Sequence, residues 1–161
     1  HSYSSAASDV YKRQMENNMN FVPAPMPDNE SRRQEAVERL QIKGTDQHDV
    51  MIVYSEMAQE LTGFAAVAAT LFDADSQYSL ASCNFPGKSG DKLMDRAQSI
   101  CSYTILSNKP TLIPDTSSDH RTANHPAVLS GMCKSYAGFP IINKDNYALG
   151  SFCLVHPEKN E

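Results

Sequence analysis

Two apolar runs joined by a short polar turn, residues 136–142 and 147–155, place the strongest constraint on how this chain can fold. The turn, residues 143–146, reads Asn-Lys-Asp-Asn, and Asn and Asp tolerate the left-handed backbone that tight turns require. This pattern predicts a β-hairpin. Because both runs are apolar on each side, at least one face of the hairpin should be covered by helices.

The rest of the chain adds strands and helices that would pack against this hairpin. A second hairpin is predicted from residues 64–72 and 77–85, and a short strand from residues 111–113. Residues 91–108 are expected to be helical in two pieces, and Pro126 should begin a short helix. Strand, helix and strand do not alternate regularly, so the order predicts an α+β sandwich with a largely antiparallel sheet.

Two helices are predicted ahead of the first strand. Ser31 and Gln34 fit a capping box, and the helix that follows should run to about residue 42 and end at Gly44. Asp46 is expected to cap a second helix that ends near residue 62. The apolar residues of this second helix recur at helical spacing and form one continuous face: Val50, Val53, Tyr54, Met57, Ala58 and Leu61.

The 161 residues are enough for one domain, which we expect to span residues 30–161. Residues 1–14 resemble a translated sequencing adaptor ahead of the first methionine, and residues 15–29 form a proline-rich leader. A net charge of −5 disfavours binding to nucleic acid or to an anionic membrane surface. The start of the chain lacks a hydrophobic signal segment, and its four cysteines lack a CxxC spacing, so we expect reduced thiols in the cytoplasm.

Several segments together resemble the GAF domain, a sensor module of bacterial signalling proteins. The similarity covers about residues 30–156 and rests on SICSYTI (99–105), on PDT with DHRTANHP (114–126), and on YAGFP with LGSFC (136–153). The resemblance implies a central antiparallel sheet of about six strands with helices on both faces, and a ligand pocket over the sheet. Two features depart from the family pattern: Thr122 replaces a usual Phe, and the usual C-terminal helix is missing before Glu161.

The resemblance implies a regulatory domain that binds an unidentified small molecule and signals through its terminal helices or by dimerisation. It implies regulation rather than catalysis. An output domain of the kinase or cyclase type would follow if the chain is a fragment. No cofactor is specified by the residues. The pocket residues that we expect, with ordinary core packing or loop capping as the alternative for each, are Cys101, Tyr103, Asp115, Asp119, Arg121 and Tyr136.

The same residues bear on four alternative functions. A free methionine-(R)-sulfoxide reductase would need an attacking and a resolving thiol, and Cys101 could supply the first, whereas Cys133 fits the second poorly. No cysteine is followed by histidine, so covalent attachment of a bilin is not expected. The loop with His120 and His125 lacks dependable ligand spacing for a metal. A ligand-free dimerisation module is the fourth alternative.

Overall fold

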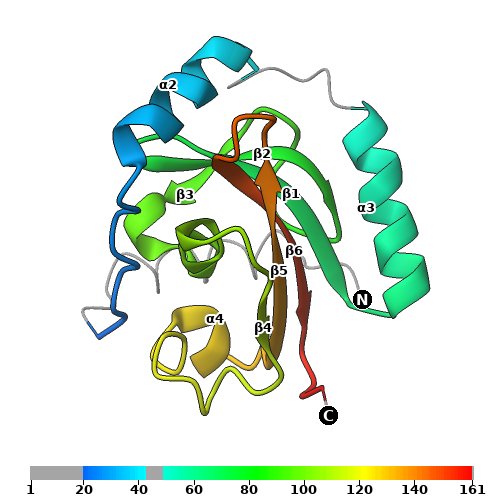
Figure 1. Ribbon diagram of the computed structural model, residues 1–161. Helices are drawn as coiled ribbons and strands as arrows, with labels where there is room; N and C mark the ends of the chain where they lie inside the picture. The colour runs from blue at the N-terminus through cyan, green and yellow to red at the C-terminus, as the bar shows by residue number, and fades with distance from the viewer. Residues whose placement is uncertain (1–19, 43–48, 161) are drawn as a thin grey trace.

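The computed structural model describes residues 20–42 and 49–160, and its centre is one six-stranded antiparallel sheet (Figure 1). The predicted helix end at Gly44, the cap at Asp46 and the segment 1–14 lie outside the described residues. The strand order is β3-β2-β1-β6-β5-β4. The predicted α+β class is confirmed by these strands: β1 Ala66–Phe72, β2 Ser76–Cys83, β3 Lys92–Asp95, β4 Thr111–Ile113, β5 Ser135–Ile142 and β6 Ala148–His156.

Both predicted hairpins are confirmed, as β1 with β2 and as β5 with β6. In the β5–β6 turn, Asn146 has φ of 68°, the left-handed backbone that an Asn tolerates in a tight turn. Strand β6 also pairs with β1, with Ala66 opposite Val155, so the first and last strands lie side by side at the centre of the sheet.

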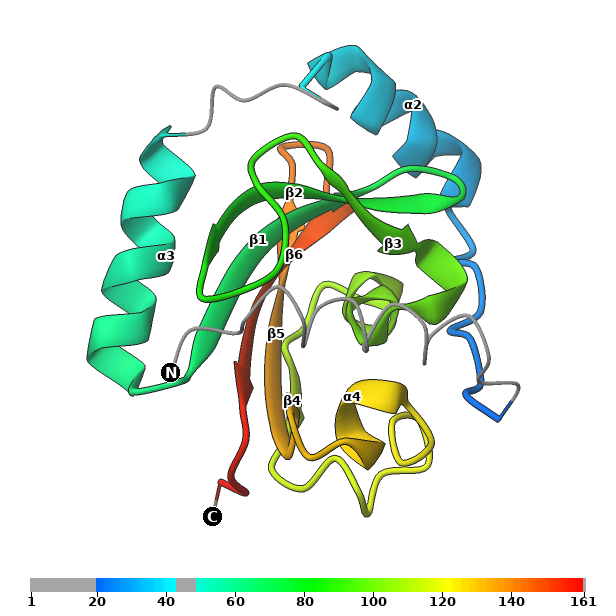
Figure 2. The same cartoon turned by 180° about the vertical axis from the view of Figure 1, so that it is seen from behind.

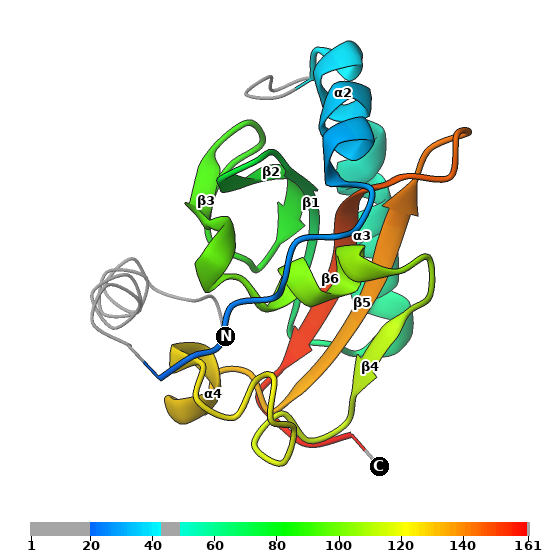
Figure 3. The ribbon, with the colours of Figure 1, turned by 60° about the vertical axis from the view of Figure 1, so that its left-hand side comes forward.

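Helices cover both faces of the sheet, as Figures 2 and 3 show from two further directions. Helices α2 (Glu30–Leu40) and α3 (Asp49–Thr62) contact β6, β1 and β2 on one face. The short helices η1 (Arg96–Gln98), η2 (Ile100–Leu106) and α4 (Pro126–Leu129) lie on the other. Each face therefore has its own hydrophobic core, and the sheet separates the two.

Helix α3 forms where the sequence predicts it, but its apolar face points away from the sheet. Among the described residues, Val50, Val53, Tyr54, Met57 and Leu61 of that face are between 51% and 80% exposed. The helix contacts the sheet through a second side, on which Met51 and Ile52 are half-buried and Ser55 is fully buried. A helix whose continuous apolar face is turned away from its own sheet leaves an exposed apolar surface.

The prediction of a helix from residue 91 is wrong. Residues 92–95 form β3, which pairs with the edge of β2, and the residues after it form the 3₁₀ helices η1 and η2. Gly87 and Gly90 take φ of 94° and 87°, which lets the chain reverse after β2. The amide of Ser79 then donates to the carbonyl of Asp91 at 2.9 Å, so pairing with β2 overrides the local preference of the segment.

The predicted capping box is also wrong. Helix α2 begins two residues early, at Glu30 with Asn29 as its N-cap, and the Glu30 carboxylate is held by two arginines. Arg33, which is 0% exposed, donates to it at 2.9 and 3.0 Å, and Arg96 of η1 donates at 2.5 and 3.1 Å. Gln34 donates its side-chain amide to the same carboxylate rather than to Ser31. We refer to Glu30, Arg33 and Arg96 as the Glu30 cluster.

The segment ahead of α2 runs along η2 and α4, as Figure 3 shows in blue. The ring of Phe21 packs edge-on against His125, with 4.8 Å between the ring centroids. The carbonyl of Val22 accepts a hydrogen bond from the Tyr103 hydroxyl at 2.8 Å. In the described part of the chain, no helix has the length and apolar character needed to cross a membrane.

Candidate ligand-binding site

A row of polar side chains crosses the face of the sheet that lies under η2. Ser79 of β2, Thr70 of β1 and Ser151 of β6 stand opposite one another in register, and all three are 0% exposed. Gln77, also buried, donates its amide to the Thr70 hydroxyl at 3.1 Å, and Thr70 donates to the carbonyl of Ser151 at 3.2 Å. We call Thr70, Gln77, Ser79 and Ser151 the polar row.

The polar row contains three buried polar atoms that have no hydrogen-bond partner within the described chain. They are Gln77 Oε1, Ser79 Oγ and Ser151 Oγ. Buried polar atoms in folded proteins almost always have a partner, because leaving one unpaired costs roughly 1–3 kcal/mol. The three atoms lie together on one side of three adjacent strands.

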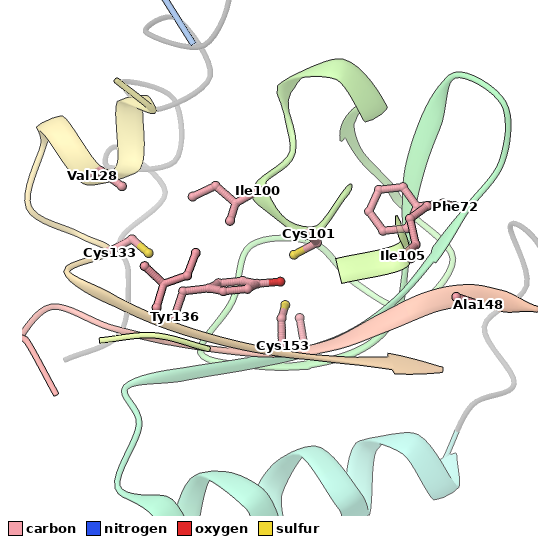
Figure 4. Packing of buried hydrophobic residues seen from close by; sticks show 11 residues of the cluster. Phe72, Ile100, Cys101, Ile105, Val128, Cys133, Tyr136, Ala148 and Cys153 are labelled. Atoms are coloured by element: carbon pink, nitrogen blue, oxygen red, sulfur yellow. The ribbon is translucent and has the colours of Figure 1, made fainter. Parts of the chain in front are cut away.

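Helix η2 brings Cys101 over the sheet. The Ser99 side chain caps this helix by accepting from the Cys101 amide at 3.1 Å, and the Ser102 hydroxyl donates to the Arg96 carbonyl at 2.6 Å. Figure 4 shows the Cys101 sulfur facing the Cys153 sulfur and the Tyr136 hydroxyl. Hydrogen bonds to Cys101, from Cys153 above all, outweigh its burial and lower the pKa of this thiol to about 7.

Tyr136 is the second predicted site residue on this face. Its hydroxyl is 2.8 Å from the Thr104 hydroxyl of η2, and the residue is buried. Burial, together with the nearby Cys101, raises the pKa of Tyr136 well above its usual range, so the phenol keeps its proton. A side chain on the neighbouring Gly138 would collide with both hydroxyl groups, so Gly138 is required for this contact.

A second group of predicted residues lies on the loop after β4, apart from Cys101. Arg121 donates to the Asp119 carboxylate at 2.9 and 2.6 Å, and its guanidinium carbon is 6.0 Å from the centroid of the Tyr103 ring. Arg121 thus holds its own loop through Asp119, which is the loop-capping alternative to a role in the pocket. The Asp115 carboxylate likewise accepts from Lys159 and from Ser117, which hold its pKa well below the usual range.

The structure therefore separates the six predicted site residues. Cys101 and Tyr136 meet under η2, whereas Tyr103, Asp119 and Arg121 meet at the surface of the loop, and Asp115 binds neighbours of its own. The polar row was missed. Its signal in the sequence is faint: Thr70 is a polar residue inside an otherwise apolar strand, and its neighbours are identified only by the strand register.

Thr122, which stands where the family pattern usually has Phe, takes part in a chain of two buried hydrogen bonds. Thr122 donates to the Thr116 carbonyl at 2.7 Å, and Thr116 donates to the Cys133 carbonyl at 2.6 Å. Cys133 lies in the same core, and burial raises the pKa of its thiol to about 12. Among the described residues, no three His, Cys, Asp or Glu side chains are grouped so that they could hold a metal ion.

Similar solved structures share this fold at low sequence identity. The GAF domain of the Acinetobacter phosphoenolpyruvate-protein phosphotransferase is 10% identical, with a TM-score of 0.57 over 84% of this chain and 82% of that chain. A free methionine-R-sulfoxide reductase from Neisseria meningitidis is 11% identical, with a TM-score of 0.56 over 100% and 81%. The chromophore-binding domain of an unusual bacteriophytochrome from R. palustris is 14% identical, with a TM-score of 0.55 over 98% and 72%.

At identities this low, the solved structures establish the fold and leave the ligand open. None of the curated proteins matches the chain. The family model of the GAF domain matches residues 46–161, which is most of the chain and includes all six strands and the polar row. This chain belongs to the GAF domain family.

Proposed function

We propose that this GAF domain is a cytoplasmic sensor that binds a small uncharged molecule between the polar row and η2. The observation that carries the proposal is the set of three unpartnered atoms, Gln77 Oε1, Ser79 Oγ and Ser151 Oγ. Gln77 Oε1 can only accept, whereas the two serine hydroxyls can donate or accept. A ligand with an N–H or O–H donor next to an acceptor, such as an amide or a neutral heterocycle, would match them.

The charges of this face favour an uncharged ligand. Burying an ion without a partner is costly, so a site for an ionic ligand normally supplies an opposite charge. Of the described residues, the buried side chains with a permanent charge are Arg33 and Arg96, and both bind the Glu30 carboxylate. Arg121 is likewise engaged, with Asp119. The polar row thus offers hydrogen bonds without a charge to balance an ion.

The signal would leave the site through β1 and α3. Thr70 belongs to the polar row, whereas its neighbours Ala69 and Leu71 point to the opposite core, which packs against α2 and α3. A ligand changes the output only if it binds two states of the domain with different affinity. The exposed apolar face of α3 is where we expect a second copy to pair, and an output domain of the kinase or cyclase type would read that dimer.

Ligand binding is tested with pairs of probes that differ only in charge: nicotinamide against nicotinate, and uracil against orotate. We expect the neutral member to raise the melting temperature and the Gln77→Leu variant to lose that response. Equal responses to the carboxylates, retained in Gln77→Leu, would contradict the site. A domain that responds to no probe but still dimerises would favour the ligand-free alternative.

The unpartnered atoms also lead to a prediction about the stability of the ligand-free domain. In the empty domain Ser151→Ala removes an unsatisfied hydroxyl, so we expect the free energy of unfolding to rise by about 1 kcal/mol. The control is Ser102→Ala, which removes a buried hydroxyl that donates at 2.6 Å and should destabilise by a similar amount. Destabilisation by both substitutions would assign Ser151 a structural role and remove the basis for the site.

Dimerisation is tested separately by sedimentation of the purified domain. Met57→Asp places a charge on the exposed face of α3 and is expected to yield monomers. Leu112→Asp is the matched control, because Leu112 is also an exposed apolar residue, 60% accessible, but lies on β4. A dimer that survives Met57→Asp and dissociates in Leu112→Asp would move the interface to the other edge of the molecule.

A further inference from the structure

Two thiols from different elements meet in the core under η2. Cys101 of η2 and Cys153 of β6 are 6% and 0% exposed, and their sulfurs point toward one another beside the Tyr136 hydroxyl (Figure 4). Cys153 lowers the pKa of the Cys101 thiol, and Cys101 raises the pKa of Cys153. The other two cysteines have different partners: Cys133 donates to the Ser135 carbonyl at 3.7 Å, and Cys83 donates to Gln59 at 2.7 Å.

We propose that Cys101 and Cys153 form a dithiol site that a hydroperoxide oxidises to a disulfide joining η2 to β6. The contact between the two sulfurs carries this inference, because a disulfide requires two thiols that face each other across a short gap. All four cysteines are free thiols in the structure, so it describes the reduced state of the pair. This oxidation needs no ligand in the polar row.

The reaction runs in two steps. The Cys101 thiolate attacks the terminal oxygen of the hydroperoxide, an S–O bond forms as the O–O bond breaks, and the leaving alkoxide takes a proton to become an alcohol. Cys153 then attacks the sulfur of the Cys101 sulfenic acid, an S–S bond forms, and hydroxide leaves with the Cys153 proton as water. The two thiols lose two electrons and two protons, and the hydroperoxide is reduced to one alcohol and one water.

The surroundings assign the two thiols different roles. The titratable groups that act on Cys101 include three weak acids: Cys153, Tyr136 and Cys133. Cys153 and Tyr136 keep their protons and donate toward Cys101, so Cys101 ionises first and attacks. Gln77 of the polar row also donates toward the same sulfur. The thiolate is thereby stabilised in a position where Cys153 can resolve the sulfenic acid.

Access to the buried pair can come through η2. This element is a seven-residue 3₁₀ helix, and runs of this helix beyond three or four residues are uncommon because its hydrogen bonds have poorer geometry. Such a segment opens at a lower free-energy cost than the central strands do. A small neutral oxidant such as hydrogen peroxide therefore reaches Cys101 during local opening of η2, while β6 stays in the sheet.

The test begins with the reduced wild-type domain and hydrogen peroxide. After denaturation and alkylation with N-ethylmaleimide, the number of labelled thiols is expected to fall from four to two, and dithiothreitol should restore four. Peptide mapping should find the cross-link between Cys101 and Cys153. The oxidation rate should rise with pH and reach half of its plateau near pH 7, where Cys101 ionises. A cross-link to Cys83 or Cys133, or no cross-link, would overturn the proposal.

Variants separate the two steps of the reaction. Cys153→Ser is expected to abolish the cross-link and leave a sulfenic acid on Cys101 that dimedone traps, whereas Cys101→Ser should abolish both products. Cys133→Ser is the matched control, since it removes a buried thiol of the same core and should leave the cross-link unchanged. If free methionine-(R)-sulfoxide oxidises the pair and hydrogen peroxide does not, the domain is a sulfoxide reductase and the hydroperoxide assignment is wrong.

Discussion

Removing the charge of Glu30 tests whether the Glu30 cluster attaches α2 to the sheet. The carboxylate binds Arg33 and Arg96, and Arg33 also donates to the carbonyls of Phe72 at 2.9 Å and Leu149 at 3.3 Å. Glu30→Gln keeps the shape of the side chain and one acceptor oxygen but leaves two buried guanidinium groups without their counter-charge. We expect the free energy of unfolding to fall, because an unpaired buried charge is destabilising.

The magnitude follows from the pKa of the carboxyl group. Burial alone would raise this pKa, but the hydrogen bonds from Arg33, Arg96 and Gln34 outweigh it and lower the value from its usual 4.5 to about 2. That difference corresponds to about 3 kcal/mol, at roughly 1.4 kcal/mol for each tenfold change in the equilibrium constant. The Glu30 side chain is 21% exposed, so solvent screening reduces the expected loss to about 2 kcal/mol.

The assay is urea unfolding of wild type and Glu30→Gln from pH 7 to pH 3, with Glu35→Gln, an exposed position on the same helix, as the control. A pKa lowered by folding stabilises the protein above the unfolded-state value, and that contribution is lost as the pH falls through the folded-state value. The difference between wild type and Glu30→Gln should therefore be full above pH 4.5 and shrink toward pH 2. Equal unfolding midpoints for wild type and Glu30→Gln at pH 7, or a difference between these two proteins that does not change with pH, would refute this account.

Three further predictions concern other parts of the fold. Burial lowers the pKa of His125 from 6.5 to about 4, although its hydrogen bond to the Gln98 carbonyl acts in the opposite direction. Wild type should therefore lose stability as the pH falls from 6.5 through 4. In urea titrations, His125→Gln should make the stability less dependent on pH over this range. Thr122→Val removes the donor to Thr116 and should lower the free energy of unfolding by about 1–2 kcal/mol in the same assay; an unchanged midpoint would deny that hydrogen bond its role. Gly150→Ala would place a Cβ against the backbone of β1, and circular dichroism should show a melting temperature at least several degrees lower.

The parts of the fold that sequence alone predicts are those written in local patterns. The β5–β6 hairpin was found because Asn143 and Asn146 mark the turn between two apolar runs. Strand β3 was missed because four residues of mixed polarity acquire strand geometry only by pairing with the edge of β2. The start of α2 was misplaced because Glu30 is held by Arg96, 66 residues away, rather than by a local cap.

Part of the candidate site was predicted, because two of its residues belong to local sequence patterns. Cys101 and Tyr136 belong to family-like segments, and the structure does bring them together. The polar row could not be predicted, because Ser79, Thr70 and Ser151 become neighbours only through the register of three strands. The direction of α3 was likewise hidden, because its continuous apolar face indicates burial against the sheet, whereas the side with Ser55 is the one that is buried there.

The neighbouring positions of β1 and β6 have a consequence for the order of folding. Strands β1 to β3 can associate among themselves, and so can β4 to β6, but the two halves join only where Ala66 meets Val155, which are 89 positions apart in the chain. Contacts between residues so distant in sequence form slowly, because the chain loses much conformational entropy before they stabilise it. During synthesis, the sheet can be completed only after β6 has left the ribosome, and until then β1 presents an unpaired edge.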